Sequence, residues 1–319
     1  MYCENTINRQ VITKMLFDIS AAGIDVIDDE LFVKKHVTLS VLRLDKIHPV
    51  VSGNKLFKLH YFLEDAIQSS HKTILSFGGA YSNHLAATAF ACKTLKLKSI
   101  GIVRGERPLV LSSTLQQCIN DGMQLKFISR QQFANKDESI FIKALQAEYG
   151  VCIIIPEGGY HPLGAKGAAH IFDLISNNNY SHICTALGTA TTLAGLLLAA
   201  KPGQVITGIP VIKGMTDIHK RIKFLIGNKE MPQNLQLLDG YHFGGYARKK
   251  ELLIQFMNTC WQQHQLPLDF VYTAKMFSAV TDSIKNDHFP KGSNILCVHT
   301  GGLQGNNSLP LDSLMFRFT

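Results

Sequence analysis

The sequence predicts an α/β protein, a three-layer fold in which helices cover both faces of a parallel sheet. From about residue 70, short apolar runs alternate with segments of helical periodicity, which is the pattern of βαβ units. The chain has 319 residues, 46% of them hydrophobic and 18% charged, enough for a real core in one large or two modest domains. No repeat or long linker divides the chain, so two domains would be interwound rather than strung in series.

Strands and helices alternate regularly along the predicted sheet. Strands are expected at 72–77, 98–103, 125–129, 151–156, 182–187, 205–211 and 293–299, and helices at 82–97, 113–121, 138–150, 162–176, 192–200, 217–226 and 273–287. In open sheets of this kind, ligands bind beyond the carboxyl ends of the strands. Four glycine-containing loops follow predicted strands and carry hydroxyl, amide or histidine side chains: 78–84, 157–167, 187–192 and 299–305.

Another helix is predicted to begin at Lys55. Apolar residues repeat at helical spacing behind it, at Leu56, Leu59, Phe62, Leu63 and Ala66. The first turn of a helix is its positive end, where a cation is mildly unfavourable. Lys55 is therefore either one ordinary lysine among many or a nucleophile held at the edge of a pocket.

Composition argues against several classes of protein. The net charge is +8, but the 32 basic residues are scattered, whereas a nucleic-acid binder would concentrate them in a patch. The seven cysteines form no CxxC pair and no zinc-like spacing, which indicates no metal site and a reducing, cytoplasmic setting. The N-terminus lacks the apolar core of a signal peptide.

One uncharged stretch, residues 183–200, just reaches the length of a membrane span. Threonines and glycines interrupt it, so a buried strand, a loop and a buried helix explain it better, and no membrane association is expected. The loop at 187–192 has two interpretations. Its backbone N–H groups and the hydroxyls of Thr189, Thr191 and Thr192 could form an anion cradle, or the threonines could merely cap the helix. It matches neither the GxGxxG nor the Walker pattern, so no nucleotide is indicated.

The remaining candidates are also ambiguous by themselves. Ser82 and Asn83 are either ordinary N-cap residues or part of a second anion site for a substrate carboxylate, with Ser82 near the reacting carbon. His84 suits a surface or packing role better than that of a base. Tyr246 and Tyr272 lie near glycines or at a helix start, and nothing local makes either catalytic.

Seven segments, taken together, form an ordered pattern: SGNKLFKL, GGAYSNH, EGG…PLGAKG, LGTATTLAG, GGYA, VYTAK and HTGGLQG. The set resembles the pyridoxal-phosphate enzymes of the 1-aminocyclopropane-1-carboxylate deaminase and D-cysteine desulfhydrase family, which belongs to the fold-type-II group typified by the tryptophan synthase β subunit. The resemblance covers roughly residues 41 to 305. It implies a tryptophan synthase β-like fold, pyridoxal 5'-phosphate as cofactor, a small amino acid as substrate and a homodimer.

The resemblance also implies a role for each matching residue. Lys55 would form a Schiff base with the cofactor, and a desolvated or cationic setting would keep its amine reactive. Asn83 would contact the 3-oxygen of the cofactor, and Ser82 would meet the substrate carboxylate or move a proton. The phosphate would be held by Gly188, Thr189, Ala190, Thr191 and Thr192. Tyr246 and Tyr272 would lie over the substrate.

Thr273 and Thr300 distinguish two reactions within this family. Thr273 matches the position facing the pyridine nitrogen, where deaminases of the family carry glutamate, and they carry leucine in place of Thr300. A carboxylate keeps the nitrogen protonated and suits ring opening, whereas a neutral threonine suffices for α-proton removal and loss of a β-substituent. The expectation is therefore α,β-elimination from a small amino acid such as D-cysteine, giving pyruvate, ammonia and sulfide.

Three alternatives stay open. One is 1-aminocyclopropane-1-carboxylate deamination on the same fold, and another is a protein that binds pyridoxal phosphate with little catalysis. The third is a plain anion-binding α/β protein in which Lys55 is ordinary. The sequence departs from the family at Tyr81, usually glutamine, at Ala190 and Ala274, usually glycine, and at Phe270, usually proline, and it lacks the usual Pro-Thr-Pro entry before the lysine. Cofactor binding tolerates such changes more readily than substrate identity does.

The expected domains share the cofactor between them, as pockets at domain interfaces often do. The small domain is predicted at 56–158, and the large domain at 1–55 plus 159–319.

Overall fold

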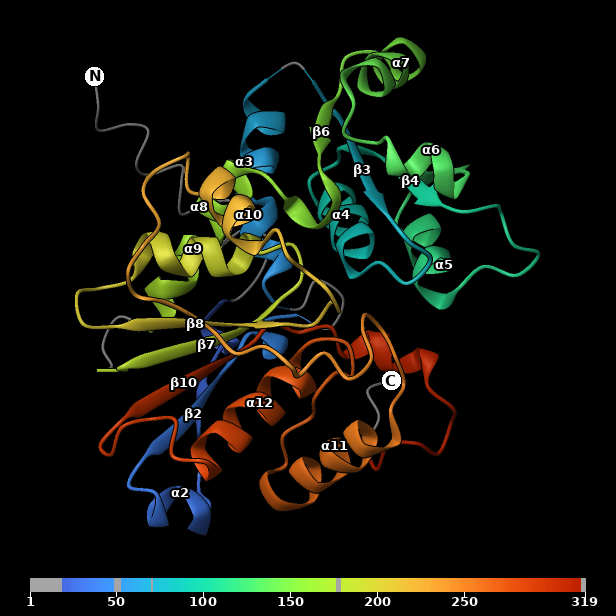
Figure 1. Cartoon of the computed structure of the whole chain (residues 1–319). Helices are drawn as coiled ribbons and strands as arrows, with labels where there is room; N and C mark the ends of the chain where they lie inside the picture. The colour runs from blue at the N-terminus through green and yellow to red at the C-terminus, as the bar shows by residue number, and fades with distance from the viewer. Residues whose placement is uncertain (1–18, 49–52, 70, 176–178, 317–319) are drawn as a thin grey trace.

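The computed structural model describes residues 19–48, 53–69, 71–175 and 179–316. Two sheets organise this part of the chain, one in each half of the molecule (Figure 1). The first 18 residues, with Cys3 and the segment in which no signal peptide is expected, lie outside the described residues.

The larger sheet has six strands in the order β1-β2-β10-β7-β8-β9. Their bounds are β1 Ile24–Ile27, β2 Thr38–Arg43, β10 Asn294–His299, β7 His182–Leu187, β8 Val205–Pro210 and β9 Leu235–Leu237. Only β1 runs antiparallel, against β2, and the remaining pairs are parallel. The sheet therefore joins strands from both ends of the chain.

The smaller sheet has four strands in the order β5-β4-β3-β6, and all of its pairs are parallel. Their bounds are β5 Met123–Ile128, β4 Lys98–Arg104, β3 Thr73–Gly78 and β6 Ile153–Ile155. Its strands fall between β2 and β7 in the sequence, so the chain leaves the larger sheet, builds the smaller one and returns.

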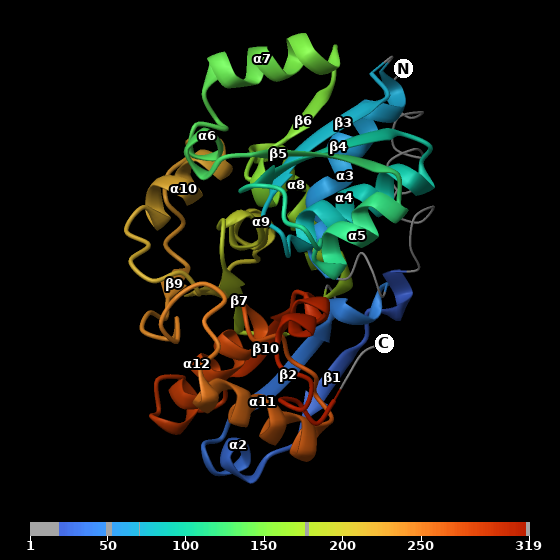
Figure 2. The same cartoon turned by 90° about the vertical axis from the view of Figure 1, so that its right-hand side faces the viewer.

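Helices cover both faces of each sheet (Figure 2). The larger sheet is covered on one face by α2 Glu30–Lys34, α11 Glu251–His264 and α12 Thr273–Lys285, and on the other by α8 Pro162–Ala169, α9 Thr191–Ala199 and α10 Ile218–Leu225. The smaller sheet lies between α4 Asn83–Thr94 with α5 Ser113–Asn120 and α6 Arg130–Ala134 with α7 Ser139–Tyr149. Short 3₁₀ turns occupy Ile19–Ala21, Leu44–Lys46, Glu157–Gly159, His170–Leu174 and Leu303–Ser308.

Strand β7 shows why the sheet needs two helical layers. Its residues alternate between the two main core clusters, with Ile183 and Leu187 on the α9 side and Cys184 and Ala186 on the α12 side. A strand that is apolar on both faces must be covered on both, which is typical of parallel sheets. Residues 183–200 thus form a strand, a loop and a helix, as predicted, and none of the helices in the described part of the chain is long and apolar enough to cross a membrane.

Helix α3, Lys55–Gln68, joins the two halves. It contacts α8 beside the larger sheet and β6 and α4 beside the smaller one. The five apolar residues predicted for its core face are all buried, and so are Phe57, Lys58, His60, Tyr61 and Glu64. The helix is therefore surrounded on nearly every side, which the apolar periodicity alone does not indicate.

The predicted three-layer α/β fold with parallel sheets is confirmed. The strands form two sheets, and the larger one also carries an antiparallel edge strand that the sequence did not indicate. Strands β1 and β2 and helix α11 were not anticipated, because the regular alternation begins only after them or is broken around them. The predicted domain boundaries stay a prediction.

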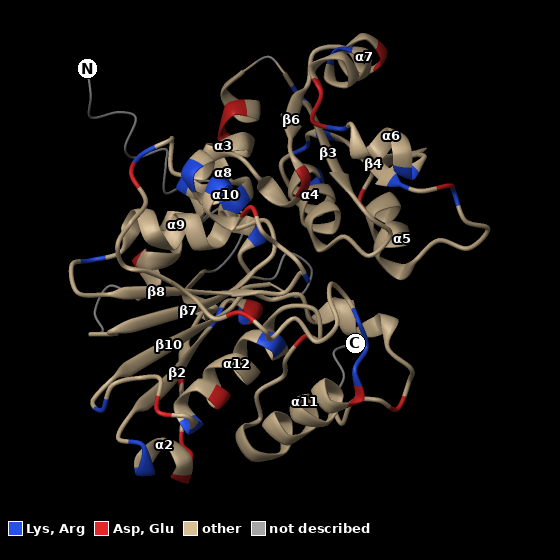
Figure 3. Cartoon of the chain, in the orientation of Figure 1, with Lys and Arg blue, Asp and Glu red and all other residues tan. Residues whose placement is uncertain are grey.

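Basic residues are spread over both halves of the molecule rather than gathered on one element (Figure 3). This matches the scattered charge of the sequence.

Candidate active site

Lys55 begins helix α3, next to two strand-end loops. The amide of Asn54, just before it, donates from Nδ2 to Thr192 Oγ1 at 2.6 Å, and its backbone N–H donates to the Thr300 carbonyl at 3.3 Å. Gly53 makes this approach possible, since a Cβ there would lie 1.8 Å from the Thr300 oxygen and its φ is +78°. The start of α3 is therefore fixed to the loops after β7 and β10.

Lys55 is a half-buried residue, and its amine lies 5.5 Å from the ring centroid of Tyr272. Burial lowers the pKa of this amine to about 8, and the carboxylate of Asp269 opposes the shift. A lysine near this pKa is partly neutral around pH 7–8, which a nucleophilic amine requires.

Lys58, one turn later on the same helix, brings a second amine to the site. Its side chain is buried, and burial together with the charge of Lys55 lowers its pKa to about 7. Lys58 was not predicted as a site residue, although a second lysine three residues after the first, within an apolar helix, is a signal for one.

His84 lies beside Lys58 under the turn at 157–159. A Cβ on Gly159 would lie 3.2 Å from Cβ of Lys58 and 3.8 Å from Cε1 of His84. Neither ring nitrogen of His84 makes a hydrogen bond of ordinary geometry with the described residues. Burial and the two lysine charges lower its pKa to about 3, against a small opposite effect of the Pro156 carbonyl, so the ring stays neutral. The expected packing role fits its burial but not its unpartnered nitrogens.

The loop before α9 has the form of an anion cradle. Ala190 is the N-cap of α9 in the left-handed conformation, with φ 69°, and no side chain caps the first turn of the helix. The alternative in which threonines cap this helix is thus wrong for this loop. Thr189 and Thr191 instead join their hydroxyls at 2.9 Å, leaving the N–H groups of the helix start available to an anion.

The loop after β3 carries Ser82 and Asn83 into the same region. Ser82 is the N-cap of α4 and accepts from the Leu85 N–H at 3.2 Å, so the ordinary capping interpretation is correct for its hydroxyl. A Cβ on Gly302 would lie 3.2 Å from Nδ2 of Asn83. The Oδ1 atom of Asn83 is buried and has no hydrogen-bond partner among the described residues, so it is ready to bind a group from outside the chain.

The two tyrosines form a pair, with the Tyr272 hydroxyl donating to that of Tyr246 at 3.2 Å. The ring of Tyr272 also lies against Gly188, 3.1 Å from the position of a Cβ there. Desolvation raises the pKa of both phenols above the ordinary value, although the Tyr246 residue is 49% exposed, so both are proton donors rather than phenolates. The buried ammonium of Lys275 donates to the carbonyl of Gly245 at 2.8 Å and so fixes the loop that carries Tyr246.

Thr273 is fully buried and has a carboxylate directly behind it. Its hydroxyl donates to Oδ1 of Asp269 at 2.7 Å, and the backbone N–H groups of residues 271–273 donate to the same carboxylate at 2.9–3.0 Å. No sequence pattern indicated Asp269, which lies four residues before α12 and is not its N-cap residue. The position predicted to be neutral is therefore bonded to an anion.

The structure thus brings the predicted residues into one region. Lys55, Asn83, Tyr246, Tyr272, Thr273, Thr300 and the 188–192 loop are linked by the contacts above, and Ser82 adjoins them through Asn83. Tyr81 is 55% exposed and does not fill the site, while Phe270 and Ala274 are core residues behind it.

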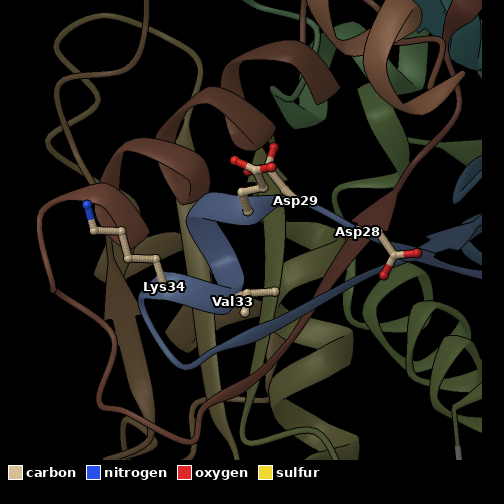
Figure 4. A pocket seen from close by; sticks show the side chains of 5 residues that line it. Asp28, Asp29, Val33 and Lys34 are labelled. Carbon is tan, nitrogen blue, oxygen red and sulfur yellow. The ribbon is translucent and has the colours of Figure 1, made fainter.

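A hollow of about 490 Å³ lies elsewhere, beside α2 (Figure 4). Asp28, Asp29, Val33 and Lys34 are among its lining residues. Because α2 connects the end of an antiparallel strand to the start of β2, this hollow lies at the amino ends of the parallel strands. It shares no residue with the site around Lys55.

A partly neutral lysine, opposite a helix start that can take a phosphate, defines the class of enzyme that uses pyridoxal phosphate. The family model described as "Pyridoxal-phosphate dependent enzyme" matches residues 32–301, and the chain belongs to this family. The protein is therefore an enzyme with pyridoxal 5'-phosphate as its cofactor.

Relatives and solved structures agree with this assignment. The chain is 29% identical over 282 residues to a Thermotoga maritima protein named "Putative 1-aminocyclopropane-1-carboxylate deaminase", covering 83% of this chain and 88% of the relative. It is 27% identical over 291 residues to the Arabidopsis thaliana bifunctional D-cysteine desulfhydrase/1-aminocyclopropane-1-carboxylate deaminase, covering 80% and 70%. A crystal structure of an ACC deaminase homologue aligns with a TM-score of 0.76 at 24% identity, covering 93% of this chain and 95% of that one, and shows the same fold.

The residues present fit the cofactor. Asn83 offers a buried Oδ1 with no hydrogen-bond partner among the described residues, and the start of α9 offers N–H groups that no side chain caps. Lys55, whose lowered pKa leaves its amine partly neutral, supplies the nucleophile that covalent capture of the cofactor requires.

Proposed function

We propose that the enzyme removes the α-proton and a β-substituent from a small amino acid, as a D-cysteine desulfhydrase does, giving pyruvate, ammonia and, from cysteine, sulfide. The observation that supports elimination is a neutral hydroxyl, that of Thr273, at the position where ring-opening relatives carry a carboxylic acid. Pyridoxal phosphate, when bound, supplies the electron sink.

The residues of this chain have distinct roles in this proposal. The 188–192 loop and the start of α9 hold the phosphate, and Asn83 orients the ring edge. Ser82 and the N-terminus of α4 bind the substrate carboxylate, which the positive helix end favours. The amine of Lys55, once displaced by the substrate, accepts the proton from the substrate Cα, and the protonated phenols of Tyr246 and Tyr272 shield that proton from water.

A second candidate reaction is the ring opening of 1-aminocyclopropane-1-carboxylate. Asp269 favours it, because a carboxylate hydrogen-bonded to Thr273 gives the hydroxyl more acceptor character toward the pyridine nitrogen. The names of the relatives from Thermotoga maritima and Arabidopsis thaliana include this reaction.

The test combines cofactor absorbance with product analysis. Protein loaded with pyridoxal phosphate is given D-cysteine, L-cysteine, β-chloro-D-alanine or 1-aminocyclopropane-1-carboxylate, and pyruvate and 2-oxobutanoate are measured. We expect pyruvate from the first three classes of β-substituted substrate, with a preference for one enantiomer. 2-Oxobutanoate alone would establish the second candidate, and an absorbance band that no amino acid changes would indicate a cofactor-binding protein with little catalysis.

Lys55→Ala tests the nucleophile. We expect loss of the visible band that the lysine gives with the cofactor and a fall in turnover on the order of a thousandfold or more, since both covalent capture and proton transfer are lost. Lys143→Ala is the matched control, because Lys143 is exposed on α7. A retained band in Lys55→Ala would assign the nucleophile to another amine, with Lys58 the nearest.

The assembly belongs to the same proposal. We expect a homodimer with a small domain at 56–158, in the cytoplasm. Light scattering on the loaded protein measures the oligomeric state. Limited proteolysis between the two sheets tests the boundaries of the small domain.

A further inference from the structure

A second cavity, of about 580 Å³, lies at the carboxyl ends of β4 and β5. Two guanidinium groups, those of Arg104 and Arg130, line it together with the apolar surfaces of Ala80, Pro108 and Phe127. Ala80 belongs to the loop that carries Ser82, and the hydroxyl of Ser112 donates to its carbonyl, which holds the loop against the cavity.

The two arginines are not neutralised by a carboxylate of the described residues. Neither forms an ion pair with a carboxylate within the part of the chain that the structure describes, and Glu106, which also lines the cavity, pairs with neither. Arg104 is held instead over the ring of Phe133, 5.7 Å from its centroid. Both arginines are exposed at the rim of the cavity, and two positive charges that line one hollow make an anion there favourable.

Arg104 also borders the candidate active site. Its Nη2 lies 3.4 Å from the position of a Cβ on Gly79, in the loop before Ser82. Its positive charge slightly lowers the pKa of the Tyr246 phenol, opposing the larger effect of desolvation, which raises that pKa. The guanidinium thus lies between the second cavity and the tyrosine pair.

We propose that Arg104 and Arg130 form a subsite for a second anionic group on the substrate, so that the enzyme prefers amino acids with a carboxylate, sulfate or phosphate on the side chain. The inference rests on the proposed function in one respect, that the substrate is an amino acid held near Ser82 and Lys55. The inference goes beyond the proposed function by assigning the chemical class of the substrate side chain.

The chemistry of the cavity supports an anion rather than a thiol. Guanidinium groups bind carboxylates, sulfates and phosphates through paired N–H donors, and such charge-assisted bonds are about twice as strong as neutral ones. A thiol or chloride substituent would use neither donor and would fill little of the 580 Å³.

The first test compares two substrates in the loaded enzyme. D- and L-serine O-sulfate carry the anion, and elimination breaks the Cα–H and Cβ–O bonds; with one water, the products are pyruvate, ammonia and sulfate. β-Chloro-alanine of the same chirality is the neutral counterpart. We expect Arg104→Gln to lower kcat/KM for the O-sulfate by about 10–100-fold and for chloro-alanine by less than about threefold, since a hydrogen bond to a charged group contributes roughly 1.5–3 kcal/mol.

Two further variants sharpen the comparison. Arg130→Gln should also lower kcat/KM for the O-sulfate more than for chloro-alanine. Arg104→Lys, which keeps the charge, should lower kcat/KM for the O-sulfate less than Arg104→Gln does. Arg107→Gln is the control, because Arg107 follows Arg104 on the same loop and is exposed like it, but is not among the residues that line the cavity. Equal losses on both substrates, or none, would overturn the inference.

The second test measures binding without turnover. Calorimetric titration of the loaded protein with aspartate and with alanine should show tighter binding of aspartate, and Arg104→Gln should abolish the difference. If aspartate keeps this advantage but no substrate eliminates, the subsite stands and the proposed reaction is wrong. If chloro-alanine is turned over but aspartate binds no better than alanine, the reaction stands and the subsite is wrong.

Discussion

Helices α3 and α9 begin side by side, joined by the bond from Asn54 to Thr192, yet their first turns differ in chemistry. Helix α3 begins with a cation, Lys55, and places Lys58 one turn later. Helix α9 begins with a left-handed alanine and two threonines and carries no cation. The positive end of a helix thus disfavours an ammonium at one start and welcomes an anion at the other.

Burial is the larger influence on the lysine. An interaction with a helix end contributes about 0.3–1 kcal/mol. The change of the Lys55 pKa from 10.5 to about 8 corresponds to about 3 kcal/mol. The helix end therefore makes only a small contribution to lowering the Lys55 pKa. Desolvation makes the main one and so sets the reactivity of the amine.

The pH dependence of cofactor capture tests the α3 half of this comparison. In cofactor-free protein, the rate of the absorbance change on adding pyridoxal phosphate should rise about tenfold per pH unit from pH 6 and level off above about pH 8, because the neutral amine of Lys55 is the nucleophile. Stopped-flow absorbance measures it. A rate that keeps rising to pH 10 would mean an ordinary exposed lysine.

Lys58→Met tests the cost of the second buried amine. The folded pKa is about 7 and the unfolded one 10.5, so between these values the unfolded chain binds more protons and the free energy of unfolding rises with pH. Below pH 7 the cost is fully present, and we expect Lys58→Met to raise the unfolding free energy of the cofactor-free protein by about 2 kcal/mol, an advantage that shrinks toward pH 10.

Urea unfolding at pH 6 and pH 10 measures this difference, with Lys143→Met as the exposed control. Equal stability of the two lysine variants at pH 6 would show that Lys58 is solvated in the protein. If Lys58 also serves the phosphate, its variant should need more pyridoxal phosphate for half-saturation.

Ala190→Gly tests the α9 half and should have the smallest effect. Alanine at φ 69° carries a steric cost of about 1–2 kcal/mol that glycine lacks, and the greater freedom of the unfolded glycine chain offsets about half of it. We expect a gain of up to about 1 kcal/mol in urea unfolding. Ala199→Gly, at the other end of the same helix, should instead lose about 0.5–1 kcal/mol, and losses at both positions would show that Ala190 is unstrained.

The sequence predicted most strands and helices because their patterns are local. Strand β7 and helix α9 could be predicted because the uncharged stretch 183–200 is interrupted by a loop of glycine and threonine. The sequence did not show that β2 belongs to the larger sheet, because its neighbours there are β1 and the distant β10. Pairing over such a separation is set by tertiary packing and leaves no mark on nearby residues.

The site shows the same division. Lys55 and the 187–192 loop were recognisable from residue type at a helix start, and the ordered motifs supplied the rest. Asp269 and Lys275 were not, because their importance comes from burial beside distant residues, whereas the spacing of Lys58 from Lys55 was a signal that could have identified it. Asp269 in particular changes the meaning of Thr273 through a hydrogen bond that no spacing rule reveals.

The placement of β10 between β2 and β7 has a consequence for how the protein is made. During synthesis, β2 emerges with only β1 beside it and waits for Asn294–His299, which pairs with Thr38–Arg43, while the entire smaller sheet is completed. Pairings between such distant segments are slow to form, and domains generally fold as they emerge. The loop that holds Thr300 against Asn54 arrives with β10, so a ribosome-bound chain that stops before residue 294 should already contain the smaller sheet and yet capture no cofactor.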